Sequence, residues 1–471
     1  MFLVMEREFD VTVRFTVVLA LTAVVLLLPT PSGLSLSGKR ALAAFVFAGS
    51  IFAMQPVSLP FASLMVSVAM VVLGVADSTQ AFEVLSRPII ILILGSLFVA
   101  EALRKHGVTR RLALFSVVSS GGDVGKILLG LMAIAALLSM WMENTATAAV
   151  LIPVALTIAN QIPEKEMARE VTVLLVLGIA YSASLGGMVT ITGSASNAVA
   201  SGFLSEIQPW GFLDWMKYGL PPFMLIFPLT WWALRRVVPV STERIDISLA
   251  REELDNLGPA RSTEWEVIVV LNATVLLWAA GSYFESYLLL PPTALSPAVV
   301  AMVAVAYLSL RGIIVWDDVK GVSWGMFFII GAGLALGDAL KRTGATAWLT
   351  ELISPVITGM PLLVTLTFLV FVSALLTNVI NNSTMAAVFV PIMISLAQVE
   401  SSFTAVQLVL PLTLATTFGY ALPSASGRMA LISETGIVER GDMMKYGLIL
   451  TVLSSIVLVL VFYVLTVLGV T

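Results

Sequence analysis

Long apolar runs separated by short charged stretches dominate the chain. Runs of span length extend from Val11 to Thr30, from Trp265 to Gly281 and from Tyr446 to Val470. A helix crosses the hydrocarbon layer of a bilayer with about 20 apolar residues, so the chain has room for roughly ten or more spans. The stretch 456–465 is apolar at every position and not at alternate ones, which favours helices over a spanning β-barrel. The pattern therefore predicts an all-α polytopic membrane protein.

Composition narrows the class further. Hydrophobic residues make up 59% of the chain and charged residues 11%, which is too apolar for a soluble globular domain. The net charge of −4 indicates no nucleic-acid partner, and the absence of cysteine excludes disulfides and thiolate metal sites. The one histidine, His106, cannot form a metal cluster alone, and we expect it in water at a basic helix end. No nucleophile, base and orienting group recur together, so the sequence indicates no enzyme. The first apolar run is expected to be a retained helix and not a cleaved signal.

The chain contains one unit twice. The stretch 101–107 recurs as 338–344, Asn144-Thr145 with 148–153 recurs as Asn382-Ser383 with 386–391, and 214–220 recurs as 442–448. These pairs keep their order at nearly constant separation. Repeats of this kind build transport sites at the middle of the bilayer.

Basic residues indicate that the two copies are inverted, because such residues concentrate on the cytoplasmic side. The stretch 104–111 carries four of them, whereas the corresponding turn of the second copy carries Lys341 and Arg342. Counting from a polar cytoplasmic linker puts the N-terminus in the cytoplasm and the C-terminus outside a cell inner membrane. The expected segments are N-terminal scaffold helices (1–86), a first repeat (87–236), the linker (237–264), further scaffold helices (265–321) and a second repeat (322–471).

Each copy holds two interruptions of its apolar sequence. Polar motifs with about 15 apolar residues on either side predict re-entrant hairpins with tips at 143–147 and 381–385. Small and polar residues further along predict broken helices at 191–197 and 422–428. With these features the fold is expected to hold about 11 transmembrane helices plus two re-entrant hairpins.

Broken helices offer chemistry for two kinds of ion. Free N–H groups at a helix start favour an anion, and freed carbonyls at a helix end suit an alkali cation. The polar side chains at the interruptions are mostly neutral hydrogen-bonding groups suited to carboxylate or oxyanion oxygens. Helix-to-helix hydrogen bonding or capping is the other explanation for such residues.

The motifs resemble those of the divalent anion/sodium symporter family of the ion transporter superfamily. The two tips read Glu143-Asn144-Thr145 and Asn381-Asn382-Ser383, and the segments 214–220 and 331–336 are also similar to that family. The similarity runs from about residue 87 to the C-terminus. It implies a homodimer with scaffold and transport domains, an elevator mechanism, and substrates such as succinate, malate, citrate or sulfate.

The resemblance and the polar pattern together give two sets of candidate residues. We expect the anion to contact Asn144, Thr145, Ser194, Ser196, Asn382, Ser383, Thr384, Ser424, Ser426 and Arg428. We expect sodium, the one metal implied, to contact Ser139, Glu143, Asn144, Gly193, Asn197, Thr377, Asn381 and Asn382.

Both tips depart from the family pattern, because Glu143 and Asn381 replace its first serine. Glu143 stands where the family has serine, and a carboxylate in the bilayer is a cation ligand, a proton carrier or a solvated residue. Arg428 binds the anion or neutralises Glu143 or Glu434. The family's Thr-Pro-Pro-Asn motif is also replaced, by 194–197 and by 424–427.

The sequence therefore predicts a secondary active transporter of small anions without a cofactor, coupled to sodium or else to protons. Against about 100 mV a dianion costs roughly 4.6 kcal/mol to bring in, and each accompanying cation returns about 2.3 kcal/mol. A dicarboxylate exchanger, a cation/proton antiporter and, from another class, an anion channel remain alternatives.

Overall fold

The computed structural model describes residues 2–357, 359–399 and 402–471, and Met1 of the expected N-terminal segment lies outside them. Over those residues the chain is helical, with no strand beyond an isolated bridge between Asp123 and Arg244. Seven of the described helices are long and apolar enough to cross a membrane, or eight if a pair bent by 50° near residue 87 is one span. Shorter apolar helices of 10–17 residues accompany them. The predicted all-α polytopic class is confirmed at this level.

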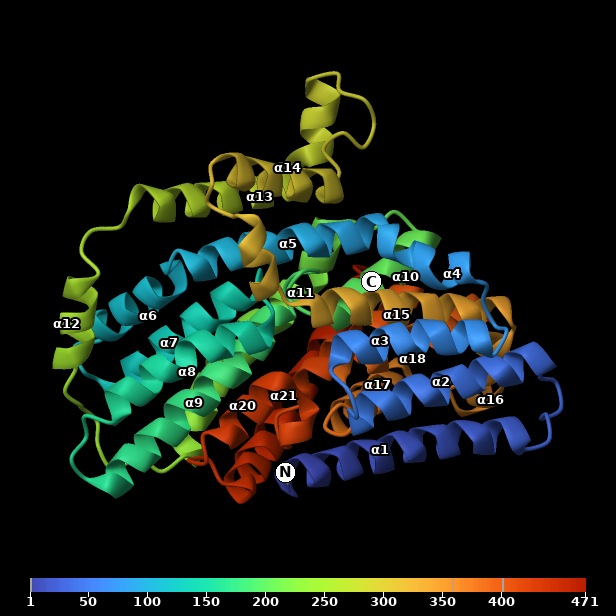
Figure 1. Ribbon diagram of the computed structural model, residues 1–471, viewed down its shortest axis with the longest axis horizontal. Coiled ribbons are helices and arrows are strands. Elements are labelled where there is room, and N and C mark those ends of the chain that lie inside the picture. Colours follow the sequence, from blue (N-terminus) through green and yellow to red (C-terminus); the bar gives the residue numbers. More distant parts are fainter. Residues whose placement is uncertain (1, 358, 400–401) are drawn as a thin grey trace.

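The helices follow one another in a repeated series (Figure 1). The chain begins with α1 (Phe2–Leu27), α2 (Leu36–Met54), α3 (Leu59–Val72), α4 (Ser78–Phe82) and the 3-10 helix η1 (Glu83–Ser86). The first series holds α5 (Pro88–Lys105), α6 (Val108–Ser119), α7 (Val124–Ser139), α8 (Asn144–Ala159), α9 (Lys165–Gly187), α10 (Ala195–Ile207) and α11 (Phe212–Val237). Between the series lie α12 (Ser248–Asn256), α13 (Ser262–Tyr287), α14 (Pro297–Leu310) and η2 (Trp316–Gly321). The second series holds α15 (Trp324–Arg342), α16 (Ala345–Ile357), α17 (Leu362–Leu376), α18 (Asn382–Val399), α19 (Ala405–Ala415), η3 (Thr416–Phe418), η4 (Pro423–Ala425), α20 (Gly427–Glu434) and α21 (Arg440–Val467).

The two series interlock in space. The helix pair α7–α8 packs on α9, and the corresponding pair α17–α18 packs on α19. Helix α18 also contacts α10 of the first series, and α8 contacts α20 of the second. The flanking helices exchange partners, since α3 packs on α15 and α14 packs on α5 (Figure 1). Each series is therefore completed by helices that precede the other one.

Contacts between connecting segments divide these segments into two groups. In one group Arg169 bonds Glu439, and Arg110 bonds Glu253 of the linker. In the other, Ser35 bonds the Thr343 carbonyl, and Tyr218 bonds the carbonyl of Val470. Helix α21 leads from Glu439 in the first group to Val470 in the second, and α11 leads from Tyr218 in the second group to the linker in the first.

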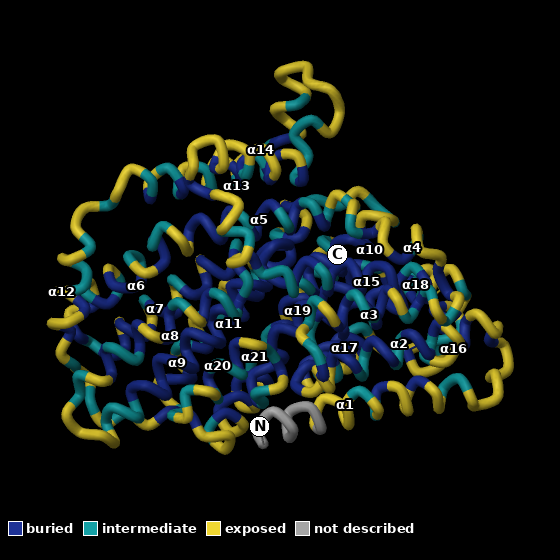
Figure 2. Tube along the Cα trace, viewed as in Figure 1, coloured by how far each residue is buried: buried dark blue, intermediate teal, exposed yellow. Residues whose placement is uncertain are grey.

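Figure 2 shows exposed positions along the outer helices, and many of these positions carry large apolar side chains. Only 11% of the apolar window of α1 and 22% of that of α13 are buried inside the protein. On α13, for example, Val269, Leu276 and Tyr287 are exposed. A water-soluble monomer rarely presents apolar patches of this size, so these faces are suited to lipid or to another apolar surface.

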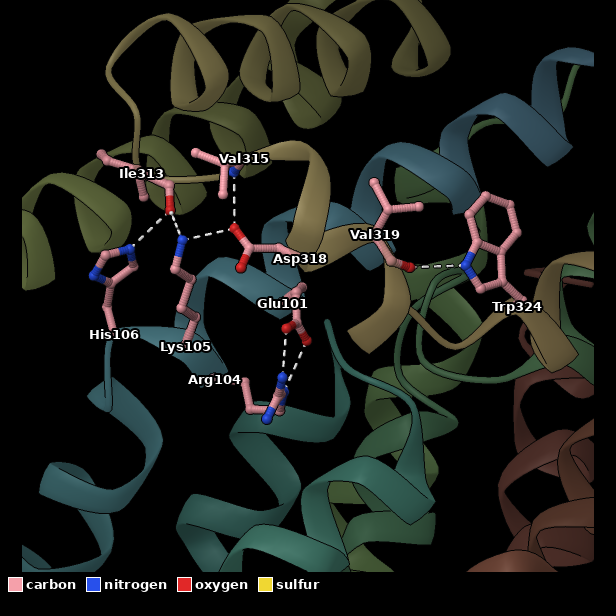
Figure 3. A network of polar contacts seen from close by, with 9 residues as sticks. All are labelled: Glu101, Arg104, Lys105, His106, Ile313, Val315, Asp318, Val319 and Trp324. Atoms are coloured by element: carbon pink, nitrogen blue, oxygen red, sulfur yellow. Dashed lines mark hydrogen bonds and ion pairs between the residues drawn. The ribbon is translucent and has the colours of Figure 1, made fainter.

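A polar network joins the end of α5 to the segment between α14 and α15 (Figure 3). The Lys105 ammonium lies 2.6 Å from the carboxylate of Asp318, and it also donates to the Ile313 carbonyl. The half-buried imidazole of His106 lies 3.0 Å from the same carbonyl oxygen. The expectation that His106 is simply solvated is therefore wrong: the loop after α14 folds back over this turn and supplies a partner for the ring.

Candidate functional site

Both tips and both helix breaks line one cavity of about 270 Å³. The start of α3 and the start of α15 close one of its sides. Its polar and glycine lining residues are Glu143, Asn144, Thr145, Gly193, Ser194, Ser323, Gly325, Asn381, Asn382, Ser383, Ser426, Gly427 and Arg428. Segments far apart in the sequence therefore meet at one place, as the repeat predicted.

The first tip is a turn of residues 140–143 between α7 and α8. Glu143 is the N-cap of α8, and its carboxylate accepts hydrogen bonds from the Ala146 N–H (3.1 Å) and the Thr145 hydroxyl (2.7 Å). An acidic side chain suits this place because the start of a helix is electropositive. The expected tip 143–147 thus lies mostly in the first turn of α8, and the negative charge of Glu143 offsets the helix dipole there.

The second tip repeats this design with a neutral residue. It spans 377–381, and the Asn381 side chain accepts from the Ser383 N–H (2.9 Å) at the start of α18. The Thr377 hydroxyl donates to the Asn382 side-chain oxygen and lies 3.0 Å from the Thr416 carbonyl. The expected tip 381–385 is accordingly the first turn of α18.

The first break covers residues 188–194, slightly before the expected 191–197. Hydroxyls of Thr190 and Thr192 both donate to the carbonyl of Met140, which ties the break to the first tip. The Asn197 amide donates to the carbonyls of Gly187 and Thr190, each at 2.8 Å. Asn197 therefore holds the break together from behind the cavity.

The second break runs from η3 to the start of α20, and its register differs from the expectation. Ser194 is the N-cap of α10 and Ser426 is the N-cap of α20, so these two serines correspond. Aligning 194–197 with 424–427, the two segments that replace the family motif, would pair Ser194 with Ser424, two residues before Ser426. Ser424 instead donates to the Asn378 carbonyl at 3.2 Å. The two Ser-Ala-Ser segments are therefore identical in sequence but lie at different positions relative to the starts of α10 and α20.

Two helix starts at the cavity have no side-chain cap. Neither Ser194 nor Ser426 accepts a capping hydrogen bond from its own helix. The Ser426 hydroxyl is buried and has no partner among the described residues. The starts of α10 and α20 thus present main-chain N–H groups and a free hydroxyl to the cavity, an arrangement suited to an anion.

Oxygen atoms crowd together beside the first tip. A Cβ atom added to Gly193 would lie 2.6 Å from the Gly187 carbonyl oxygen and 2.7 Å from that of Ser139. One end of the Asn144 amide lies 3.0 Å from the Ala183 carbonyl oxygen and 3.3 Å from that of Gly193. The amide can take two orientations. If its nitrogen lies at this end, it donates a hydrogen bond to both carbonyls. If its oxygen lies there, three oxygens face one another and a cation is needed between them. Glycine at 193 keeps this place open.

Arg428 is the buried cation of the site. Its side chain is 2% exposed, and its guanidinium donates to the carbonyls of Thr417 and Gly419, each at 3.3 Å. Of the residues that line the cavity, Glu143 and Arg428 are the ones that carry charge. Their opposite charges leave the lining neutral overall.

The candidate residues divide between the cavity and its supporting layer. Ten of them are lining residues: Glu143, Asn144, Thr145, Gly193, Ser194, Asn381, Asn382, Ser383, Ser426 and Arg428. The lining does not include Ser139, Ser196, Asn197, Thr377, Thr384 or Ser424. For example, Ser196 bonds Ser194 (2.8 Å) and Thr416 (3.2 Å), which joins the two breaks.

Sequence reasoning missed Asn378. Its amide oxygen accepts from the Ala421 N–H at 3.0 Å, and its amide nitrogen donates to the Ala374 carbonyl at 2.8 Å. This buried residue fastens the second tip to the second break. An asparagine two residues after the end of an apolar run was the available signal.

Known proteins resemble the chain over nearly its whole length. Residues 10–470 match the family described as the sodium:sulfate symporter transmembrane region. An uncharacterized transporter of Haemophilus influenzae is 29% identical over 424 residues, covering 88% of this chain and 89% of the relative. The sodium-dependent dicarboxylate transporter SdcS of Staphylococcus saprophyticus is 26% identical over 461 residues, covering 93% and 88%. The crystal structure of the YdaH transporter of Alcanivorax borkumensis overlays with a TM-score of 0.49 at 15% identity, covering 99% and 98%. The match over residues 10–470 places the chain in the sodium:sulfate symporter family.

Proposed function

We propose that this protein is a sodium-coupled symporter of a small dianion, a dicarboxylate or sulfate, which binds where the four helix starts meet. The observation that carries the proposal is the pairing of two ion environments in one cavity. Uncapped N–H groups of α10 and α20 suit the anion, and the oxygen atoms around Gly193 suit sodium. Placed side by side, each bound ion stabilises the other, which is the basis of coupling.

The anion meets neutral donors and no excess charge. The Asn382 and Ser383 side chains, the Ser426 hydroxyl and the helix starts surround it. Such donors fit carboxylate and sulfate oxygens alike. The relative SdcS is described as a dicarboxylate transporter, which favours this class for the present chain.

The cation site lies between the first tip and the first break. It uses the main-chain oxygens of Ser139 and Gly193 with the amide oxygen of Asn144 turned toward them. Neutral oxygen ligands suit an alkali ion that has lost its water.

We further propose the membrane topology that the sequence predicted. Helix pairs α7–α8 and α17–α18 are re-entrant hairpins that enter from opposite sides, and about 11 helices cross the bilayer. The group of connections that includes the linker is cytoplasmic. The first residues of α3 and α15 line the cavity, and we propose that they face the cytoplasm in an inward-facing state of an elevator transporter. The exposed apolar faces leave room for a homodimer.

Transport by the purified protein in liposomes tests the proposal. Uptake of succinate or sulfate should saturate and should require an inward sodium gradient. Asn382→Ala should abolish this uptake while thermal stability stays near that of the wild type, because Asn382 lines the cavity. Asn272→Ala is the matched control, since this exposed amide bonds only within α13.

Other results would identify the alternatives. Counterflow without sodium would indicate an exchanger, and uptake that does not saturate would indicate a channel. Unchanged affinity and rate in Asn382→Ala would show that the anion binds elsewhere.

A further inference from the structure

We infer that Arg428 is a built-in cation that takes the coupling-ion position of the second break, so that the first break alone binds sodium. The inference rests on the proposed function, because it assumes that freed carbonyls at a break are where a coupling cation binds. The expected sodium ligands lie in both halves of the chain, and the inference confines the bound sodium to the first half. The two breaks can be compared directly, since Ser194 and Ser426 start corresponding helices.

Side-chain donors already occupy the freed carbonyls of the second break. Arg428 donates to the oxygens of Thr417 and Gly419. The neighbouring oxygens of Phe418 and Tyr420 accept from the hydroxyls of Thr451 (2.8 Å) and Tyr181 (3.5 Å), and the Thr377 hydroxyl lies 3.0 Å from the Thr416 oxygen. Four consecutive carbonyls, 417–420, therefore have partners without any ion.

The first break leaves oxygens available. Asn197 and Trp215 donate to the carbonyls of 187, 188 and 190. The Asn144 amide faces the Gly193 carbonyl: in one orientation its nitrogen donates to that carbonyl at 3.3 Å, and in the other its oxygen points there. A cation gains ligands here that it cannot gain at the second break.

Carbon atoms also fill the second position. A Cβ atom placed on Gly419 would lie 3.2 Å from the Ala425 methyl and 3.3 Å from the Thr377 methyl. At the first break the residue before the N-cap is Gly193 in place of alanine, and a serine, Ser139, ends α7 at the position that corresponds to Thr377. Two extra methyl groups thus occupy the space that stays open beside Gly193.

The guanidinium is a suitable replacement for an ion. It remains protonated in proteins, and the negative end of a helix dipole faces it at the end of α19 and η3. The Arg428 Nε atom is buried without a partner in the described part of the chain, and the residue lines the cavity. A fixed positive charge thus supports the anion from behind.

Equilibrium binding of radioactive ²²Na⁺ to the purified full-length protein tests this inference without any anion. The wild type should bind one sodium per protomer. Gly193→Ala should bind none, because its methyl group fills the first position. The double variant Arg428→Gln/Ala425→Gly should bind two, and Arg428→Lys, which keeps the charge, should still bind one.

Each result separates the inference from the proposed function. Two sodium ions on the wild type, or one left on Gly193→Ala, overturn the inference, and this holds even if the double variant fails to fold. A folded double variant that gains no sodium site also overturns it. If the wild type binds none and the double variant binds one, Arg428 does take the second position, but the first break binds no sodium and the sodium coupling of the proposed function fails. Succinate uptake by the same preparations then shows whether transport itself persists.

Discussion

Glu143 caps a helix and also places a negative charge in an anion cavity. Because both of its carboxylate oxygens already accept hydrogen bonds, we expect sodium activation to persist in Glu143→Gln. Loss of the like charge should lower the Kd for the anion about threefold to tenfold, or about 0.7 to 1.4 kcal/mol. The weaker cap should lower the free energy of unfolding by about 1 kcal/mol.

Uptake measured against anion, sodium and pH checks this prediction. Glu164→Gln is the matched control, since Glu164 is the exposed N-cap residue of α9 and its side chain makes no capping bond. Loss of pH dependence in Glu143→Gln alone would instead identify a proton carrier. Weaker sodium activation would identify a sodium ligand and contradict our expectation.

Single residues also show which parts of the site could be predicted from the sequence. Asn144 and Asn382 could be predicted from the repeat alone, and both line the cavity. The capping role of Glu143 could not, because capping depends on where the helix begins. Arg428 was expected to pair with the anion or with a carboxylate, whereas its partners are carbonyls of a loop whose course the sequence does not specify.

At the scale of elements, the ion pair between Lys105 and Asp318 should stabilise the contact between the α5–α6 turn and η2. Burial raises the pKa of Asp318, but the Lys105 ammonium and the Val315 N–H more than offset this, so its pKa is lowered. A lowered pKa stabilises the fold at pH values above the unfolded pKa of about 3.9. This stability is lost as the pH falls through the folded pKa.

Thermal unfolding in detergent at neutral pH and near pH 3 measures the effect. Asp318→Asn should lose about 1 kcal/mol at neutral pH and show a smaller loss on acidification than the wild type. Asp317→Asn is the control, because Asp317 and its partner Lys320 are both nearly fully exposed. Equal acid sensitivity of the wild type and Asp318→Asn would show that this pair does not tie the elements together.

Element boundaries were predicted unevenly. Small and polar residues located the first break to within a few residues of 188–194, because glycine and serine weaken an apolar helix visibly in the sequence. The sequence alignment of the second break was wrong by two residues. The Ser-Ala-Ser sequence occurs in both breaks, but in the second break Ser426, and not Ser424, starts the helix. The residue at which a helix begins depends on capping geometry, and similarity between two short sequences does not determine that geometry.

At the scale of the molecule, the recurrence of one helical series followed from the sequence, whereas the exchange of flanking helices did not. Helix α3 packs on α15 and α14 packs on α5 across more than two hundred residues of chain. Apolar helices of this kind carry little information about their partner, because one apolar face fits many others. The contact became visible only in three dimensions.

A single sodium site sets the net charge that the whole protein moves in one cycle. Arg428 and Glu143 are part of the chain, so each moves one way with the loaded carrier and back with the empty carrier. Their charges therefore contribute no net charge movement over a full cycle. One sodium with a dianion then carries one negative charge inward, which an inside-negative potential of 100 mV opposes by about 2.3 kcal/mol.

Steady-state accumulation of succinate in liposomes should therefore fall when potassium and valinomycin set such a potential, relative to liposomes clamped at zero. Accumulation that is indifferent to the potential would indicate two cations per dianion. Accumulation that rises would indicate at least three, and either result would contradict the assignment of Arg428 as the second cation.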